Sequence, residues 1–342
     1  MNANWARTLA CCLMVCLWVA WSAAEDRKLV RNCASPQRYQ ELVQGNTGFR
    51  QSVSALNEES KKLYGLWATD ASKLPGPITI PVVVHVIFNT DAQKISQAQV
   101  QSQIDVLNRD FGTRYLNQVP ERFRSLAAKA DIQFRLAVRD PDGKATTGIT
   151  YTQTKVGVFS NGDDDAVKSK ARGGHDPWPR DDYLNLWVCN LEKSDDHQPL
   201  LGYSSWPLEP AAVDGVVILY RVFGTAGVEK SDYDQGRTAT HEVGHWLNLH
   251  HLWGDGLDNA GCDQDDGVGD TPTQKDKHYD CPNKPVVSCD GPKGDMFMNY
   301  MDYSPDKCMC LFTVGQVRRM QATINTARAS LRKSEGLAPP LP

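Results

Sequence analysis

The sequence predicts an α+β protein in which a mixed β-sheet packs against a long helix. Residues 78–88 form a β-branched run, ITIPVVVHVIF, that is long enough for a buried strand. Residues 96–111 follow with apolar side chains at helical spacing. Four more strands are predicted at residues 132–138, 148–154, 183–191 and 215–223. The expected sheet therefore has five strands.

The composition is that of an ordinary globular protein. Of 342 residues, 41% are hydrophobic and 23% are charged, and the formal net charge is -4. A chain of this length can bury a full core. The weak negative charge offers no basic face for nucleic acid, and no internal period indicates a repeat protein. Composition therefore excludes classes of protein without naming one.

The N-terminus has the pattern of a secretory signal peptide. An apolar run at residues 9–20 precedes small residues that end at Ala24. The run is shorter than the about 20 apolar residues that a membrane-spanning helix needs, and no later stretch qualifies. We therefore predict a signal peptide at residues 1–24, a secreted chain and no membrane span. A lipoprotein that uses Cys11 or Cys16 is the alternative, although no convincing lipobox precedes either cysteine.

A boundary is predicted at Pro75-Gly76-Pro77, because two prolines and a glycine interrupt both helix and strand. Upstream of it, residues 25–75 are polar and helix-prone, which suggests a separate segment. Downstream, residues 76–334 form the main domain, and residues 335–342 form a tail. This main domain contains the predicted sheet and two further helices, at residues 238–249 and 313–331.

Residues 254–295 differ from the rest of the main domain. They are rich in Gly, Asp, Pro and Cys and have almost no apolar periodicity, so we expect an irregular region held by disulfides, to which metal ions can add. Seven of the ten cysteines remain once the signal peptide is removed. In an oxidising compartment an odd number leaves one thiol over, and Cys33 is the outlier by position.

The clearest chemical pattern is HEVGH, from His241 to His245. Residues four apart on a helix lie on one face, so both imidazoles can reach one metal ion. Glu242 lies beside the metal, where it can take a proton from water. His251 follows ten residues after His241, where a chain that turns can bring a third imidazole to the ion. Three protein ligands and an open position describe a catalytic zinc site, whereas four ligands describe a structural one.

The sequence favours His251 over other third ligands, and it suggests other roles for the remaining histidines. A rival kind of zinc site takes a later glutamate as its third ligand, but the sequence has no glutamate from Val243 to Ser334, which leaves only Glu335 in the tail. An aspartate ligand stays open, because this region is rich in aspartate. We expect His85 to be a core histidine and His250 to lie at the surface or beside the site.

The three-histidine pattern resembles that of the metzincins, whose motif is HExxHxxGxxH. The glycine of that motif falls on Asn248, and asparagine is the next most tolerant residue in the left-handed conformation that this position requires. The longer pattern of HEVGHWLNLHH, DDGVGDTP, NYMDYS and CMCLFTVGQVRRM is similar to the pappalysin family over residues 78–331. This resemblance implies a metzincin-like fold: a twisted, mixed five-stranded sheet, two long helices above the active-site cleft, and an irregular, disulfide-held lower subdomain with a C-terminal helix.

The resemblance also implies roles for single residues around the zinc motif. Met301 would form the methionine turn beneath the ligands, and Tyr303 would stabilise the reacting oxyanion. Asp306, in the segment after that turn, would help to wall the specificity pocket and would favour Arg or Lys after the scissile bond. Arg31-Asn32-Cys33 resembles the Arg-x-Cys element of metzincin pro-segments, although Ala34 stands where glycine is common. A Cys33 thiolate would then fill the open zinc position in a latent precursor.

Structural calcium and disulfides are further implications of the same resemblance. Asp266, Asp270 and Thr271 offer oxygen ligands for calcium. The implied disulfides are Cys262–Cys289 and Cys281–Cys308, which leaves Cys189 and Cys310 as the remaining pair.

The sequence as a whole predicts a secreted zinc endopeptidase that is made as a latent precursor. It should act on protein or peptide substrates as a monomer, with one catalytic Zn²⁺ and with structural Ca²⁺. A zinc hydrolase of a non-peptide amide is one alternative, because the site chemistry would be the same. A catalytically inactive secreted zinc-binding module is the other, although it gives Glu242 no role and needs a fourth protein ligand.

Overall fold

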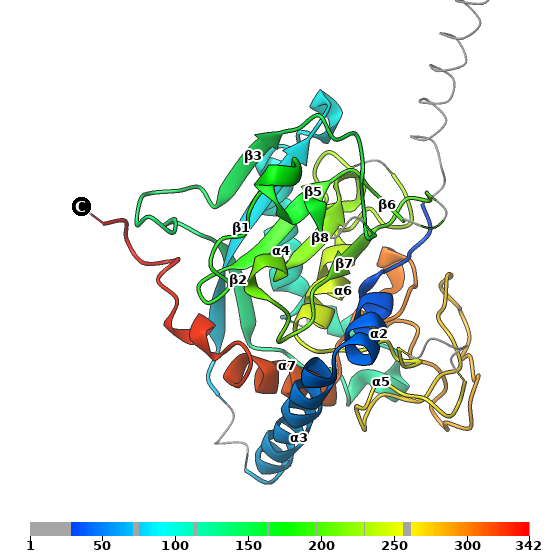
Figure 1. Ribbon diagram of the computed structural model, residues 1–342. Coiled ribbons are helices and arrows are strands. Elements are labelled where there is room, and N and C mark those ends of the chain that lie inside the picture. Colours follow the sequence, from blue (N-terminus) through cyan, green and yellow to red (C-terminus); the bar gives the residue numbers. More distant parts are fainter. Residues whose placement is uncertain are drawn as a thin grey trace, which may run out of the picture.

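The computed structural model describes residues 29–70, 75–112, 115–162, 165–193, 195, 197–228, 230–255 and 261–341. The predicted signal peptide lies outside these residues. The described chain contains an N-terminal helical segment (residues 29–70), a region built on a β-sheet and a lower region of long loops (Figure 1). No helix in the described ranges is long and apolar enough to cross a membrane.

A six-stranded sheet carries the five predicted strands and one more. Its order is β2-β1-β5-β8-β7, and β3 also pairs with β1. All pairings in it are parallel except the antiparallel pair of β7 and β8, so the sheet is mixed as predicted. The strands are β1 (Ile78–Phe88), β2 (Ile132–Leu136), β3 (Ile149–Gln153), β5 (Leu184–Cys189), β7 (Gly202–Ser204) and β8 (Val216–Leu219).

Two features of the sheet differ from the five-stranded expectation. Strands β2 and β3 pair with successive halves of β1, so they share one edge of the sheet. At the other edge lies β7, a strand of only three residues that the sequence pattern did not reveal. A separate small sheet pairs β4 (Phe159–Ser160) with β6 (Leu191–Glu192).

Helices α4 (Gln97–Asp110) and α6 (Arg237–Trp246) pack against each other and against the sheet. Helix α4 begins where predicted, because the Ser96 hydroxyl accepts a hydrogen bond from the Gln99 amide at 3.1 Å. Helix α6 packs on β7 and β8 and is buried along its whole length. This packing places the helix that carries the HEVGH pattern beside the edge of the sheet.

The lower region contains the short helix α5 (Glu121–Arg124), the loops of residues 261–312 and helix α7 (Val314–Asn325). A capping box of Thr313 and Gln316 begins α7. The loops carry the disulfides Cys262–Cys289 and Cys281–Cys308, the two pairs that the family resemblance implied. The third predicted pair is wrong: Cys189 lies at the end of β5, and within the described chain it forms no disulfide with Cys310.

The N-terminal helical segment lies across the rest of the protein (Figure 1). Its helices are α2 (Ser35–Gly45) and α3 (Thr47–Thr69), and α3 packs against α7. Phe49 and Val53 of α3 form an apolar cluster with Trp206, which follows β7. Residues 31–34 run along β7, where Cys33 forms a parallel bridge with Gly202. The segment therefore covers the edge of the sheet beside α6.

Candidate active site

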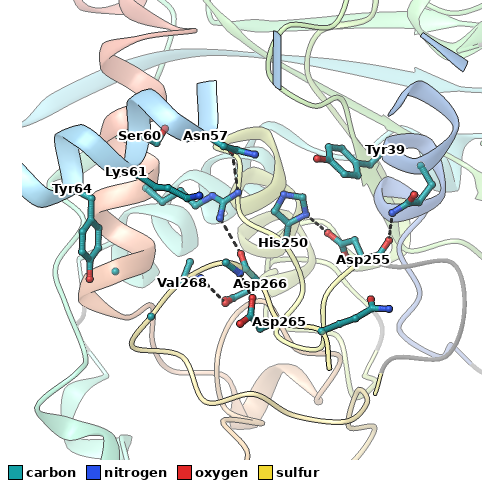
Figure 2. A pocket seen from close by; sticks show the side chains of 16 residues that line it. Tyr39, Asn57, Ser60, Lys61, Tyr64, His250, Asp255, Asp265, Asp266 and Val268 are labelled. Carbon is teal, nitrogen blue, oxygen red and sulfur yellow. Dashed lines mark hydrogen bonds and ion pairs between the residues drawn. The ribbon is translucent and has the colours of Figure 1, made fainter. Parts of the chain in front are cut away.

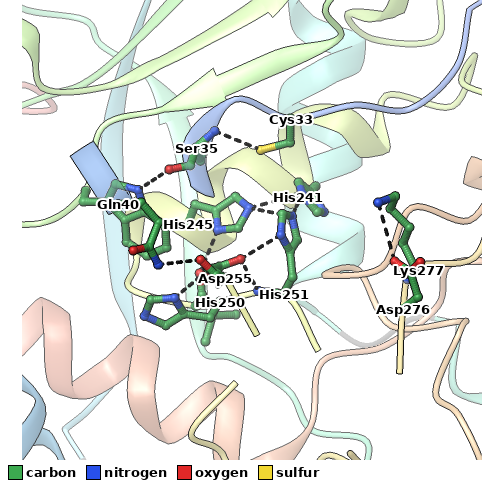
Figure 3. Close-up of polar contacts among 12 residues, drawn as sticks. Cys33, Ser35, Gln40, His241, His245, His250, His251, Asp255, Asp276 and Lys277 are labelled. Atoms are coloured by element: carbon green, nitrogen blue, oxygen red, sulfur yellow. Dashed lines mark hydrogen bonds and ion pairs between the residues drawn. The ribbon is translucent and has the colours of Figure 1, made fainter. Parts of the chain in front are cut away.

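The three predicted histidine ligands converge on one point. The Nε2 atom of His241 lies 3.0 Å from that of His251 and 3.2 Å from that of His245, and the third pair is 3.1 Å apart. All three side chains are buried, with at most 1% exposed. Figure 3 shows the imidazoles facing one another beneath the N-terminal helical segment.

A second contact orients each of these imidazoles. The Nδ1 atoms of His241 and His245 lie 2.7 Å from the carbonyl oxygens of Tyr300 and Leu249, and Nδ1 of His251 lies 2.8 Å from Asp255 Oδ1. A proton on Nδ1 satisfies each of these contacts and leaves Nε2 as a lone-pair donor, which is the tautomer that binds metal. Burial lowers the pKa of His241 and His245 well below the ordinary value, and the neighbouring imidazoles lower it further, so both rings are neutral.

The geometry fits a zinc ion. Zinc binds imidazole nitrogen at about 2.0–2.1 Å with near-tetrahedral angles, which separates the nitrogens by about 3.3 Å. The observed separations of 3.0–3.2 Å are close to this value. Nothing else in the described chain accounts for so close an approach of three ring nitrogens. Three neutral imidazoles are also a donor set that suits zinc.

The end of helix α6 and the turn below it position the ligands. Asn248 has φ of 73°, the left-handed conformation expected at the place of the motif glycine, and the chain turns there to bring His251 back. Met301 lies directly beneath the helix: a β-carbon on Gly244 would come within 2.4 Å of its sulfur. Gly244 therefore allows α6 to rest on Met301, which is fully buried.

Glu242 and Cys33 meet at the same site. The Cys33 sulfur and the three Nε2 atoms lie within 4.8 Å of one another. Glu242 Oε2 accepts hydrogen bonds from Cys33 Sγ at 3.3 Å and from Ser35 Oγ at 3.0 Å. Burial raises the pKa of Glu242 to about 8, although these hydrogen bonds favour its charged form. Burial and the nearby Glu242 raise the pKa of the Cys33 thiol well above its ordinary value.

Asp306 lies beside this cluster and is fully buried. Its Oδ2 accepts hydrogen bonds from the backbone amides of Gln235 and Arg237, at 2.9 and 3.2 Å. Its Oδ1 forms an ion pair with Arg31 of the N-terminal helical segment. Arg31 also lies over the ring of Tyr233, with 5.0 Å between the guanidinium carbon and the ring centroid. Backbone amides of the main domain therefore hold the Asp306 carboxylate in place, and Arg31 neutralises its charge.

Tyr303 and three residues that sequence reasoning missed surround the ligands. The Tyr303 ring meets the rings of His241 and His251 edge-on, with centroids 5.7 and 5.0 Å apart. Trp253 stacks on His251 at 4.4 Å. Asp255 contacts two histidines, and its Oδ2 lies 2.5 Å from Nδ1 of His250, which is therefore beside the site rather than at the surface. The third missed residue is Ser35, whose hydroxyl donates a hydrogen bond to Glu242. Only the spacing of four residues from His251 could have indicated Asp255.

The residues predicted to bind calcium line or adjoin a cavity of about 590 Å³ below α3 (Figure 2). Asp266 Oδ1 accepts hydrogen bonds from the Val268 amide and the Thr271 hydroxyl, and Asp266 Oδ2 is buried without a hydrogen-bond partner in the described structure. Asp270 points elsewhere, because its two oxygens contact Thr313 and Gly315 at the start of α7.

Fold and site together define a zinc metalloprotease of the metzincin type. Residues 167–325, which include the histidine pattern and Met301, match the peptidase family M43, described as pregnancy-associated plasma protein-A. An extracellular metalloprotease of Arthroderma benhamiae is 32% identical over 275 residues, which cover 78% of this chain and 79% of the relative. One of Colletotrichum graminicola is 32% identical over 325 residues, which cover 91% and 96%. The chain belongs to this family, the pappalysins.

Solved structures support the same assignment. A promirolysin mutant of Tannerella forsythia is 41% identical, with a TM-score of 0.80, and the match covers 91% of this chain and 100% of that one. Mature mirolysin of the same organism, in complex with a cleaved peptide, is 47% identical with a TM-score of 0.70, and the match covers 75% and 96%. The precursor form thus matches more of this chain than the mature form does.

Proposed function

We propose that the protein is a secreted zinc endopeptidase in which the three converging histidines hold the metal and Glu242 is the general base. The observation that carries this proposal is the separation of 3.0–3.2 Å between the three Nε2 atoms, with Glu242 on the helix that carries His241 and His245. Secretion is supported by the signal-like N-terminus and by relatives that are named extracellular metalloproteases.

The residues of the site suit peptide hydrolysis. When bound, zinc supplies a Lewis acid and lowers the pKa of water towards about 7. Glu242 accepts a proton from the attacking water at its carboxylate and returns it to the leaving amine. Tyr303, edge-on to two of the imidazoles, donates a hydrogen bond from its hydroxyl to the developing oxyanion.

Replacing Glu242 by Gln tests the assignment. Casein hydrolysis by the activated protein should fall by at least about 100-fold, while metal analysis still finds one zinc per chain. A chelator should stop hydrolysis by the unmodified protein, and added zinc should restore it. If casein stays intact while small amides are cleaved, the non-peptide hydrolase is correct. If neither is cleaved, the inactive module is correct.

We further propose that residues 25–75 form a pro-segment and that Cys33 keeps the precursor latent. The Cys33 sulfur lies where it can fill the fourth zinc position, which would displace the catalytic water. Burial opposes the thiolate, but a bound zinc ion would favour it. The greater coverage by promirolysin, 91% against 75% for mature mirolysin, is consistent with a removable segment. The precursor with Cys33→Ala should hydrolyse peptides before any cleavage, and unchanged latency would contradict the proposal.

We also propose that Asp306 selects Arg or Lys after the scissile bond. Backbone amides hold one carboxylate oxygen, and Arg31 pairs with the other, so a basic substrate side chain can replace Arg31 once the pro-segment leaves. A charge-assisted hydrogen bond contributes about 1.5–3 kcal/mol, or roughly 10- to 100-fold in kcat/KM. Peptides with Arg at this position should therefore be cleaved faster than matched Leu peptides. The Asp306→Asn variant should lose this preference, and an apolar preference in the parent enzyme would refute it.

Calcium binding is retained as a proposal centred on Asp266. Its buried, unpartnered Oδ2 atom is the feature that supports a cation, whereas Asp270 contacts helix α7 instead. Burial raises the pKa of Asp266 to about 7, although the hydrogen bonds from Thr271 and Val268 and the charge of Arg319 lower it. Calcium should raise the unfolding temperature of the zinc-loaded protein, and Asp266→Asn should remove that increase. An unfolding temperature that does not respond to calcium would reject the site.

A further inference from the structure

A second arginine of the N-terminal helical segment is bound by acidic groups, as Arg31 is by Asp306. Arg38, on α2, donates from Nε and Nη2 to the Glu209 carboxylate, the closest contact being 2.6 Å. Its Nη1 lies 2.8 Å from Asp165 Oδ2. The two carboxylates are buried, with 0% and 6% of their side chains exposed, whereas Arg38 is 22% exposed. Burial alone would lower the pKa of Arg38, but the hydrogen bond and charge of Glu209 raise it.

The main domain also contacts both carboxylates directly. Glu209 Oε1 accepts a hydrogen bond from the Trp206 amide at 2.6 Å. Asp165 Oδ1 accepts one from the Tyr203 hydroxyl at 3.1 Å and lies 3.0 Å from the Lys168 ammonium. One oxygen of each carboxylate therefore has a contact of its own within the main domain, and Arg38 contacts both oxygens of Glu209 and Oδ2 of Asp165.

The charges at this place do not balance once Arg38 is gone. Lys168, fully buried, compensates one of the two carboxylates and also donates to the Val213 carbonyl. Removal of Arg38 takes away the cation that contacts the Glu209 carboxylate in the described structure, whereas Lys168 still pairs with Asp165. A planar guanidinium that contacts both carboxylates restores the balance.

The position of the pair relates it to the cleft. Tyr203 belongs to β7, the edge strand along which residues 31–34 run, and Glu209 follows that strand. Arg31 and Arg38 lie on opposite sides of Cys33 along the chain, so the docked segment contacts Asp306 before it reaches the histidine cluster and Glu209 after it. An edge strand is also where an extended peptide adds to a sheet.

We propose that Asp165 and Glu209 form a second subsite, for an arginine or lysine side chain on the N-terminal side of the scissile bond. The proposal rests on the proposed peptidase function and on Asp306 as the site for the residue after that bond. From Cys33 to Arg38 the chain covers on the order of 10 Å, which an extended substrate spans in about three residues. The enzyme would then prefer substrates with two basic residues, one on each side of the cleaved bond.

Peptide pairs test this inference on the activated, zinc-loaded enzyme. Each pair carries Arg or its neutral isostere citrulline at one position, two to four residues before the scissile bond, with Arg kept after the bond. At one of these positions the Arg peptide should have a kcat/KM about tenfold higher than the citrulline peptide. Ratios near one at all three positions would overturn the proposal without any variant.

Substitution then assigns the effect to the carboxylate pair. Glu209→Gln should reduce the Arg/citrulline ratio to near one, while the preference for Arg after the bond is kept. Glu335→Gln is the control, since the Glu335 side chain is 71% exposed and pairs with Arg139 instead of with a residue of the carboxylate pair. An unchanged ratio in Glu209→Gln would overturn the assignment. If no peptide is cleaved by the parent enzyme, the proposed peptidase function fails instead, so the two failures can be told apart.

Discussion

Replacing Arg31 by Met should give a precursor that hydrolyses peptides before the chain itself is cut. Arg31 is 1% exposed and Asp306 is fully buried, so the substitution leaves an uncompensated carboxylate under the docked segment. Breaking a buried ion pair in this way costs about 3–5 kcal/mol. We take the lower value, about 3 kcal/mol, because Nε and Nη1 of Arg31 have no hydrogen-bond partner in the described structure. Docking of the segment should then weaken by roughly 100-fold.

The assay is the initial rate at which freshly purified precursor cleaves a quenched fluorescent peptide, with gels to show that the chain is still uncut. Arg50→Met is the matched control, because Arg50 is exposed on the same segment and donates to Thr47 within its own helix. Cys33→Ala sets the upper limit of leakage. The Arg31→Met precursor could instead cleave the peptide within about threefold of the parent rate while Cys33→Ala cleaves it much faster. The Arg31–Asp306 pair would then not support latency, and the reasoning from burial would fail.

Three further predictions concern stability. Burial lowers the pKa of His85 to about 3, whereas an unfolded histidine titrates near about 6.5, so the folded state binds fewer protons between these values. The contribution of neutral His85 to the free energy of unfolding is complete above about pH 6.5 and is lost as the pH falls towards 3. Urea unfolding should therefore show a free energy of unfolding that is about 2.5 kcal/mol lower at pH 4.5 than at pH 7.5. This difference should be absent in His85→Gln. An equal loss in both proteins would place the effect elsewhere. Asn248→Ala should cost about 1–2 kcal/mol, because φ is 73° there, whereas Asn248→Gly should stay within about 1 kcal/mol of the parent; equal stability of the two variants would argue against backbone strain. Each disulfide joins residues 27 apart, so the paired replacement of Cys262 and Cys289 by Ser should lower the free energy of unfolding by roughly 3 kcal/mol, and an unchanged midpoint in denaturant would show that these loops are held by other contacts.

The metal-binding part of the site could be predicted because its geometry is local. His241 and His245 share one face of a single helix, and the turn at Asn248 brings His251 back within ten residues. Helical periodicity and a left-handed residue are short-range properties, so spacing in the sequence carries them directly. The long strand β1 and the helices α4 and α7 were predictable for the same reason.

The elements that the sequence did not reveal are those that depend on distant parts of the chain. Strand β7 has three residues and no periodicity of its own, and it exists because β8 offers it an antiparallel partner. The pairing of Cys189 with Cys310 came from elimination, and elimination cannot test whether two buried side chains face each other.

The amino-acid sequence by itself therefore determined the type of metal site, the likeness to the pappalysins and the two disulfides of the lower loops. Only the tertiary structure decided what faces that site. It joins Arg31 to Asp306 across 275 positions, places Cys33 beside Glu242 across 209, and sets Arg38 against Glu209 across 171. Contacts of this separation depend on how α2 and α3 dock on the sheet and on α7. They also depend on burial, because a buried charge without a partner is unfavourable. No spacing rule within the chain encodes them.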